Sequence, residues 1–461
     1  MSDLESVGVA VIGAGPVGLA AAAHLAERGL DFVVLEAGDS PASAIGEWGH
    51  VRLFSPWRFD TDSAARRLLG ADGWQEPDPD GLPTGADLID DYLAPLAKRL
   101  DGRVRYGARV EAVTRLGFDR VRSAGREESP FLVRLDGGDE LIASAVIDAS
   151  GTWRTPNVLG ANGIPARGEQ DAGDAVVHSL PDVLGSDRDR FAGRRTVVVG
   201  TGHSASTTLL GLAELAAGEP GTEVVWAIRT VSPRRAYGGG EADELPARGA
   251  LGTLLRKQVE AGRIQVVTGF GIRTVGRDAG GVALTSGDGR TLTADLVVNA
   301  TGFRPDHTIA SELRLDLDPI LGSTRALAPL IDPNKHSCGT VPPHGVDELA
   351  HPETGYYALG VKSYGRAPTF LLATGYEQAR SVVAAIAGDW AAARDAQLEL
   401  PETGVCSSSL VDGDAEVTGG CCGPAATDSQ PDKRGLATGV SGGLLTIPLV
   451  DVAAGQGGCC N

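Results

Sequence analysis

The sequence predicts an α/β protein with two Rossmann-like dinucleotide-binding domains, one inserted into the other, and a flexible cysteine-containing C-terminal tail. The prediction rests on two copies of a glycine-rich turn, GAGPVG from Gly13 to Gly18 and GTGHSA from Gly200 to Ala205. Each copy lies between an apolar stretch typical of a buried strand and a run that favours a helix. Because a helix N-terminus after such a turn binds a pyrophosphate, two copies indicate two bound dinucleotides.

The first unit has the full pattern of a dinucleotide site. The expected strand, helix and second strand occupy residues 7–12, 19–28 and 32–35. Gly13, Gly15 and Gly18 allow the backbone to approach the ligand closely, and the second strand ends in Glu36, which would accept hydrogen bonds from ribose hydroxyls. The alternative is a glycine-rich packing turn without a ligand.

The second unit repeats this order of elements with one change at the end of its second strand. The expected strand, helix and strand occupy residues 194–199, 206–217 and 223–228, and the expected binding residues of the turn are Gly200, Gly202, Ser204 and Ala205. Arg229 follows, at the place where the first unit has an acid. A guanidinium pairs bidentately with a 2′-phosphate, so Arg229 favours NADPH over NADH, unless it is only a solvated strand end.

A second repeat supports two related units. LIASAVIDASG from Leu141 to Gly151 and LTADLVVNATG from Leu292 to Gly302 both read as a strand that runs into a turn of small residues. Together with ATGY from Ala373 to Tyr376, these motifs resemble the two-dinucleotide flavoprotein superfamily. The resemblance implies that the first fold binds FAD and that the insert binds the nicotinamide. The order of motifs and the change of composition along the chain predict an FAD domain at 1–160 and 295–395, an NADPH domain at 161–294 and a tail at 396–461.

The cysteines separate two branches of this superfamily. Disulfide reductases use a CxxC or CxxxxC pair over the flavin, but Cys338 is the only cysteine before residue 400. GTGHSA and NATGFRPD (Asn299–Asp306) are similar to motifs of N- and S-oxidising flavin monooxygenases, and IGEWGHVRLFSPW, which includes Trp48, resembles their flavin-contacting segment. The pattern FxGxxxHxxxY/F/W, anchored on His178, has Ala172, Asp174 and Asp182 at its defining positions, which indicates a neighbouring branch.

Two long segments resemble the flavin-binding monooxygenases that are encoded with arsenic-resistance genes. They cover residues 338–382 and 50–62. In the first segment Lys362, Tyr364 and Arg366 cluster, and such groups would stabilise negative charge that develops in an active site. We predict catalytic roles for Tyr364, Arg366 and Cys338. The alternatives are a surface loop with ordinary charges and, for Cys338, a small apolar core residue.

The tail contains two vicinal cysteine pairs, Cys421–Cys422 and Cys459–Cys460, and no aromatic residue or histidine. Adjacent Cα atoms lie about 3.8 Å apart, below the lower limit of ~4.4 Å for a relaxed disulfide. Each pair would instead offer two thiolates to a soft ion such as trivalent arsenic, mercury or copper(I). These four cysteines are the predicted metal ligands, and the alternative is an extension whose cysteines have no role.

Charge and composition limit the partners. The formal net charge is −19, which disfavours nucleic acids and anionic membranes, because both attract proteins rich in Lys and Arg. The acidic start of the chain lacks the features of a signal peptide, and no apolar run would span a bilayer, so we expect a cytoplasmic protein. The oligomeric state stays open, with a homodimer as one alternative.

The sequence therefore predicts an oxidoreductase with FAD and NADPH as cofactors and molecular oxygen and a small molecule as substrates. The favoured reaction is monooxygenation of a soft nucleophile, with a trivalent arsenical in arsenic resistance as the favoured substrate. Two alternatives remain: a flavin reductase of a thiol-bound metal ion, similar to mercuric reductases, and a metalloid-binding flavoprotein with little turnover.

Overall fold

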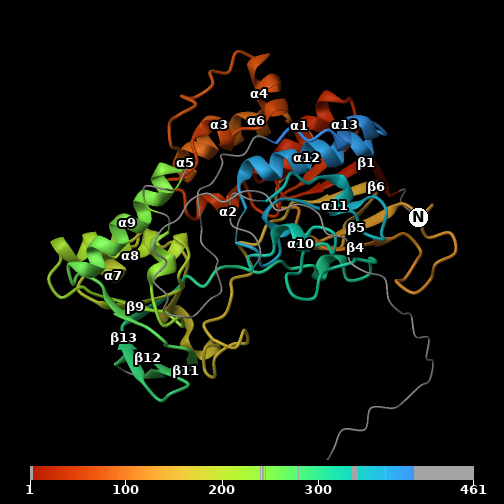
Figure 1. Cartoon of the computed structure of the whole chain (residues 1–461). Helices are drawn as coiled ribbons and strands as arrows, with labels where there is room; N and C mark the ends of the chain where they lie inside the picture. Colours follow the sequence, from red (N-terminus) through yellow and green to blue (C-terminus); the bar gives the residue numbers. More distant parts are fainter. Residues whose placement is uncertain are drawn as a thin grey trace, which may run out of the picture. The chain divides into compact units, whose positions relative to one another are not determined.

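The computed structural model describes residues 4–238, 240, 243, 245–278, 280–334, 341–368 and 370–398, all of which lie in the unit Met1–Leu410. Figure 1 shows three sheets with helices packed against them, so the predicted α/β class with Rossmann-like sheets is confirmed. The predicted metal ligands Cys421, Cys422, Cys459 and Cys460 and the predicted catalytic Cys338 fall outside the described residues.

The first sheet combines strands from both ends of the described chain. Its order is β3-β2-β1-β6-β5-β4, and β15 also pairs with β6. The strands are β1 (Glu5–Ile12), β2 (Phe32–Leu35), β3 (Val104–Arg105), β4 (Val110–Arg115), β5 (Phe131–Leu135), β6 (Glu140–Asp148) and β15 (Tyr356–Ala358). The pairs of β1 with β2 and β6, and of β15 with β6, are parallel, so these strands end at the same edge of the sheet.

Two long helices cover one face of this sheet. The helices α1 (Pro16–Glu27) and α12 (Leu372–Ile386) lie side by side in Figure 1, and α4 (Ser63–Gly70) packs against α1. The alanine run Ala20–Ala23 in α1 is completely buried, because its small side chains let the neighbouring elements approach closely. The other helices of this part are α2 (Ser43–Gly46), α3 (Trp57–Asp60), α5 (Gly85–Leu88), a π-helical turn (Ile89–Leu93), α6 (Ala94–Arg99), α10 (Ala328–Ile331), α11 (Val346–Leu349) and α13 (Trp390–Arg394).

The middle of the chain forms a second parallel sheet and a small antiparallel one (Figure 1). The parallel sheet has the order β10-β9-β8-β14-β7, with β7 (Val176–His178), β8 (Arg195–Val199), β9 (Glu223–Ala227), β10 (Gln265–Val267) and β14 (Leu296–Asn299). The antiparallel sheet contains β11 (Ile272–Asp278), β12 (Gly281–Ser286) and β13 (Thr291–Ala294). The helices here are α7 (Arg188–Phe191), α8 (His203–Gly218) and α9 (Pro246–Glu260). Short 3-10 turns lie at Gln170–Ala175, Arg234–Tyr237, Thr308–Ala310 and Gly360–Lys362.

The second copy of the longer repeat folds differently from the first. The first copy forms the single strand β6, whereas the second divides at Asp295 into β13 and β14, which belong to different sheets. Asp295 causes the break, because its carboxylate accepts a hydrogen bond from the Arg195 amide at 2.7 Å and its own amide donates to the Arg195 carbonyl at 2.9 Å. Since β14 pairs with β8, the predicted boundary at residue 294 lies one strand before the end of the second sheet.

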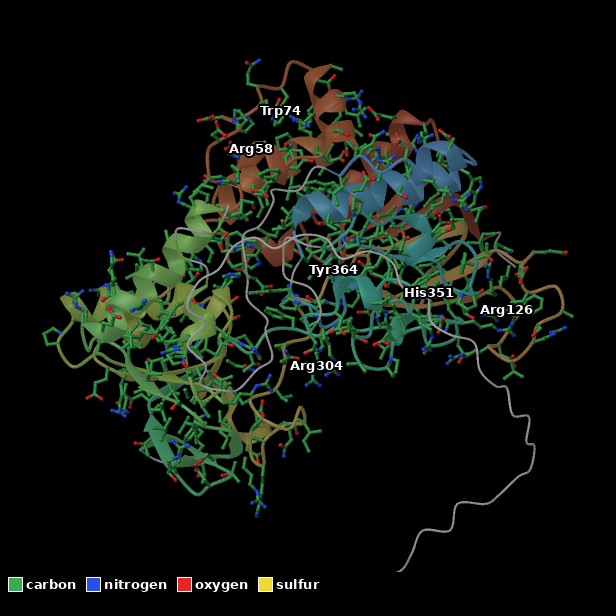
Figure 2. All side chains as sticks on the ribbon, in the orientation of Figure 1. Arg58, Trp74, Arg126, Arg304, His351 and Tyr364 are labelled. Carbon is green, nitrogen blue, oxygen red and sulfur yellow. The ribbon has the colours of Figure 1, made fainter. Side chains whose placement is uncertain are left out.

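The two connections between the sheets run next to each other. Pro156 and Phe303 form an antiparallel bridge, and the Asn157 amide donates to the Gly302 carbonyl at 2.8 Å. The Arg304 guanidinium donates to Asn157 Oδ1 at 2.6 Å, and Figure 2 marks Arg304 at this crossing. The segment that contains the second sheet therefore leaves and returns at neighbouring points.

No helix among the described residues is long and apolar enough to cross a membrane.

Candidate active site

The first glycine turn joins β1 to α1 and has the backbone that its sequence requires. Gly13 has a φ of +98°, and a Cβ on it would lie 2.8 Å from the Ala149 carbonyl oxygen. A Cβ on Gly18 would lie 2.0 Å from the Gly13 carbonyl oxygen, so both positions exclude a side chain. Gly15, the N-cap of α1, has open space around its Cα and lines a cavity. Packing thus requires Gly13 and Gly18, while Gly15 leaves room for a ligand at the helix N-terminus.

Glu36 follows β2 directly, and its side chain forms hydrogen bonds to both the glycine turn and the next loop. Its Oε2 accepts a hydrogen bond from the Ala14 amide at 2.7 Å, and its Oε1 accepts from the Gly38 amide at 2.8 Å and from Ser43 Oγ at 3.0 Å. The residue is buried and lines the same cavity as Gly13 and Gly15. A carboxylate has about four acceptor positions, so one remains for a ribose hydroxyl.

The cavity has a volume of about 510 Å³, within the range of roughly 300–1,000 Å³ that is usual for small-molecule and cofactor sites. Its polar wall consists of the glycine turn and Glu36. Its apolar wall includes Trp48, Leu53, Trp153, Phe370 and Leu372. Trp48 and Trp153 lie with ring centroids 6.3 Å apart. The cavity therefore has a polar end at a helix N-terminus and a flat apolar end. Such a cavity suits a dinucleotide that carries a large aromatic ring.

The second glycine turn joins β8 to α8 in the same way. Gly200 has a φ of +135°, and a Cβ on it would lie 2.0 Å from the Ala300 carbonyl oxygen. Gly202 is the N-cap of α8 and is open, as Gly15 is at α1. Ser204 and the buried Ala205 lie in the first turn of α8. The turn that is predicted to bind NADPH therefore has the required shape.

Arg229 lies two residues beyond the end of β9 and is exposed. Among the described residues its guanidinium has no ion-pair or hydrogen-bond partner. The charge is thus available to a ligand at the edge where β8 and α8 meet. A role in binding a 2′-phosphate stays a prediction.

The three residues of the predicted charge cluster point to different surroundings. Tyr364, which is labelled in Figure 2, is buried. Its ring contacts those of His344 and Phe370, with centroid distances of 5.6 Å and 5.3 Å. Burial raises the pKa of Tyr364 well above its usual value, so the phenol stays protonated. Arg366 is exposed, and neither residue belongs to the cavity wall. Lys362 does line the cavity. Catalytic roles for Tyr364 and Arg366 stay predictions.

Sequence reasoning missed the acidic partner of Lys362. Asp148, the last residue of β6, is completely buried and accepts a hydrogen bond from Lys362 Nζ at 2.6 Å. The signal lay in the repeat, because VIDASG has an aspartate where VVNATG has Asn299. The side-chain amide of Asn299 donates to the Asn157 carbonyl at 2.7 Å. The side chain at this position of the repeat therefore makes a hydrogen bond to another part of the chain in both copies.

The family profile described as "Pyridine nucleotide-disulphide oxidoreductase" matches residues 10–319, which include both glycine turns and most of the cavity wall. The chain belongs to the pyridine nucleotide-disulphide oxidoreductase family. The predicted enzyme class, an oxidoreductase, is therefore confirmed, and so is the predicted relationship to two-dinucleotide flavoproteins.

Curated relatives of this family member include plant monooxygenases. The chain is 34% identical over 212 residues to "Indole-3-pyruvate monooxygenase YUCCA1" of Oryza sativa subsp. japonica, a match that covers 44% of this chain and 45% of the relative. It is 30% identical over 236 residues to "Indole-3-pyruvate monooxygenase YUCCA6" of Arabidopsis thaliana, covering 50% of each. The chain thus spans about half the length of the curated relatives that it matches.

Solved structures of similar fold come from reductases and monooxygenases. Bacillithiol disulfide reductase Bdr (YpdA) from Bacillus cereus has a TM-score of 0.62 and 19% identity, over 83% of this chain and 99% of that one. The flavin-containing monooxygenase from Stenotrophomonas maltophilia has a TM-score of 0.55 and 22% identity, over 84% and 99%. Ornithine N-hydroxylase from Kutzneria sp. 744, solved with reduced FAD and NADP+, has a TM-score of 0.54 and 18% identity, over 83% and 99%. These likenesses show the fold.

Proposed function

We propose that the protein is an FAD- and NADPH-dependent monooxygenase that oxidises a soft nucleophile in the cytoplasm. We further propose that the substrate is a trivalent arsenical and that the reaction serves arsenic resistance. The cavity beside the first glycine turn supports the FAD site, and the free Arg229 beside the second supports NADPH.

The residues that would hold FAD are those of the polar and apolar cavity walls. Gly13, Gly15 and Gly18 let the pyrophosphate approach the N-terminus of α1, and Glu36 accepts a ribose hydroxyl. Trp48 lies on the apolar wall, where it excludes water from the ring end of the site. FAD, when bound, would supply the redox chemistry that links NADPH oxidation to the reduction of oxygen.

The residues that would hold NADPH are Gly200, Gly202, Ser204 and Ala205 at the N-terminus of α8, together with Arg229. The turn is held in place from behind, because Trp226 Nε1 donates to the Gly200 carbonyl at 2.7 Å. Arg229 would distinguish NADPH from NADH by pairing with the 2′-phosphate.

The observation that favours a monooxygenase over a reductase is the composition of the cavity wall. No cysteine lines the cavity among the described residues, and the whole sequence contains neither CxxC nor CxxxxC. A dithiol relay of the kind that disulfide reductases use therefore has no residues to carry it. The monooxygenases among the curated relatives support oxygen as the oxidant.

The arsenical substrate rests on sequence. Residues 338–382 and 50–62 resemble monooxygenases encoded with arsenic-resistance genes, and the vicinal cysteine pairs of the tail suit a thiophilic ion. The predicted thiolates are Cys421, Cys422, Cys459 and Cys460, and they would collect the metalloid for the site.

The experiment measures NADPH oxidation and oxygen uptake by the FAD-loaded protein with methylarsenite, arsenite, an organic sulfide or indole-3-pyruvate. We expect methylarsenite to stimulate both rates in a 1:1 ratio and to yield the oxidised, pentavalent arsenical. Stimulation by the sulfide or by indole-3-pyruvate alone would support monooxygenase activity but refute the arsenical as the substrate. Substrate-dependent NADPH oxidation that continues without oxygen would instead indicate the metal-ion reductase. Stoichiometric metalloid binding with background oxidation would indicate the binding protein.

A further inference from the structure

A buried polar network lies at the end of β6 and includes two residues of the cavity wall, Ser150 and Lys362. Lys362 Nζ donates to Asp148 Oδ2 at 2.6 Å and to Ser150 Oγ at 3.0 Å. Ser150 Oγ donates to Asp148 Oδ1 at 2.6 Å, and Tyr356 Oη donates to Asp148 Oδ2 at 2.9 Å. The side chain of Lys362 is only 2% exposed, so the network fixes the ammonium group in one position.

The network keeps Asp148 ionised. Burial alone would raise the pKa of Asp148, but the Lys362 ammonium and the hydrogen bonds from Lys362, Ser150 and Tyr356 hold it below its ordinary value. Asp148 is therefore a carboxylate, and its ion pair with Lys362 holds the lysine side chain in place.

The amino group of Lys362 has one donor left over. Lys362 carries three N–H donors, of which two bond to Asp148 and Ser150, and no third partner occurs among the described residues. Lys362 and Ser150 both line the cavity. The network also touches the glycine turn, because a Cβ on Gly13 would lie 3.2 Å from Ser150 Cα.

The helix at this turn lacks one of its own donors. α1 begins with Pro16, which has no backbone N–H, whereas α8 at the second turn begins with His203, which has one. An anion at the N-terminus of α1 thus meets one donor fewer than an anion at α8. Lys362 lines the same cavity as this turn and has an unused donor.

Resting on the FAD site of the proposed function, we propose that Lys362 donates a charge-assisted hydrogen bond to the pyrophosphate of the dinucleotide in this cavity, and that Asp148 positions it. Lys362 is then a binding residue for the anionic centre of the cofactor and not a residue that contacts its aromatic ring. The contact takes the place of the backbone donor that Pro16 removes.

The test is equilibrium binding to the apo-protein. Flavin fluorescence reports the Kd of FAD, competition against FAD reports the affinity of ADP at the same site, and riboflavin serves as a ligand without phosphate. For Lys362→Gln we expect both FAD and ADP to bind about 10- to 100-fold more weakly, the usual effect of losing a hydrogen bond to a charged group. Riboflavin affinity should stay within about twofold, because riboflavin has no phosphate for Lys362 to bind.

Two further variants make the result interpretable. Lys98→Gln removes the same charge from the exposed end of α6 and should leave all three affinities unchanged. Because Lys362→Gln leaves Asp148 buried without its counter-charge, the double variant Asp148→Asn with Lys362→Gln removes both charges together. It should fold and show the same loss of ADP affinity.

The outcomes separate this inference from the proposed function. Wild-type protein that takes up no FAD would overturn both. Variants that bind FAD and ADP as tightly as wild type would overturn the inference alone. Weaker binding of FAD and riboflavin with unchanged ADP affinity would also overturn it, since Lys362 would then contact the ring portion.

Discussion

The carboxylate of Glu36 accepts a hydrogen bond from the Ala14 amide at 2.7 Å, so the acid that is predicted to bind the ribose also fixes the glycine turn. In Glu36→Ala, the Ala14 and Gly38 amides and the Ser43 hydroxyl lose their acceptor. We expect a loss of about 1–3 kcal/mol of unfolding free energy and at least tenfold weaker FAD binding. Glu36→Gln, which keeps one acceptor oxygen, should lose less of both. Urea denaturation and FAD titration measure the two effects. Full FAD affinity in Glu36→Ala would refute the ribose contact.

Alanine substitutions at Gly13 and Gly15 are expected to have different effects, the first on folding and the second on ligand binding. Gly13→Ala puts a Cβ 2.8 Å from the Ala149 carbonyl oxygen at a φ of +98°, so we expect destabilisation. Gly15→Ala has a compatible backbone and open space, so its melting temperature should stay near wild type. Because the added methyl group points into ligand space, FAD should no longer bind. Calorimetry and bound-flavin absorbance test the pair, and Gly15→Ala with normal FAD content would contradict the placement of the ligand.

Arg229 is expected to select the nicotinamide cofactor. Arg229→Ala should raise the KM for NADPH by about 10- to 100-fold, the effect of losing a charged hydrogen-bond partner, and should leave the KM for NADH nearly unchanged. Arg263→Ala removes an exposed guanidinium at the far end of α9 and serves as the control. Steady-state kinetics with both cofactors gives the ratio of the KM for NADPH to the KM for NADH. Equal rises for NADPH and NADH would show that Arg229 does not bind the 2′-phosphate.

Asp60 should make folding stability depend on pH. Burial raises its pKa to about 7, although Ser55 donates a hydrogen bond to it at 2.7 Å. The unfolded carboxyl ionises near pH 4, so between pH 4 and 7 the folded state binds the extra proton. Stability from this group is complete below pH 4 and is lost as the pH rises through 7, by up to about 4 kcal/mol. Unfolding free energies of wild type and Asp60→Asn should therefore diverge over this range, with the variant gaining relative stability as pH rises. Asp72→Asn, at an exposed position, should run parallel to wild type.

Glu353 joins two buried arginines and is expected to be essential for stability. It accepts from Arg115 Nε and from Arg126 Nη2, both at 2.8 Å, and Figure 2 labels Arg126. Glu353→Gln leaves two buried guanidinium groups without a counter-charge and should cost about 3–5 kcal/mol. Glu140→Gln breaks the exposed pair with Arg134 and should cost about 0–1 kcal/mol. Chemical denaturation compares the two, and similar small losses would show that the buried cluster is not important for stability.

Local patterns in the sequence predicted the glycine turns and the strands around them. The strand over residues 32–35 is observed as expected, and Gly13, Gly15 and Glu36 meet at one cavity because parallel strands end at the same sheet edge. The Asp148–Lys362 pair was not predictable in this way. The two residues are 214 positions apart, and their contact exists only because β15 returns to pair with β6.

The charge cluster was predicted as a group because its members are close in sequence. A 3-10 turn at Gly360–Lys362 sends neighbouring side chains in different directions, so Lys362 reaches the cavity, Tyr364 enters the core and Arg366 faces solvent. Spacing alone does not reveal which of three nearby side chains faces a site. Backbone turn geometry decides it.

The segment between Asn157 and Gly302 starts and ends at neighbouring points, so it can be exchanged as a unit. Both ends of that segment meet within one hydrogen bond of 2.8 Å, so a short turn would join them if the segment were removed. A different domain could therefore be placed at this junction without altering the order of strands in the first sheet. Loss of the segment at the same junction would leave the first sheet continuous, because none of its strands lies between Asn157 and Gly302.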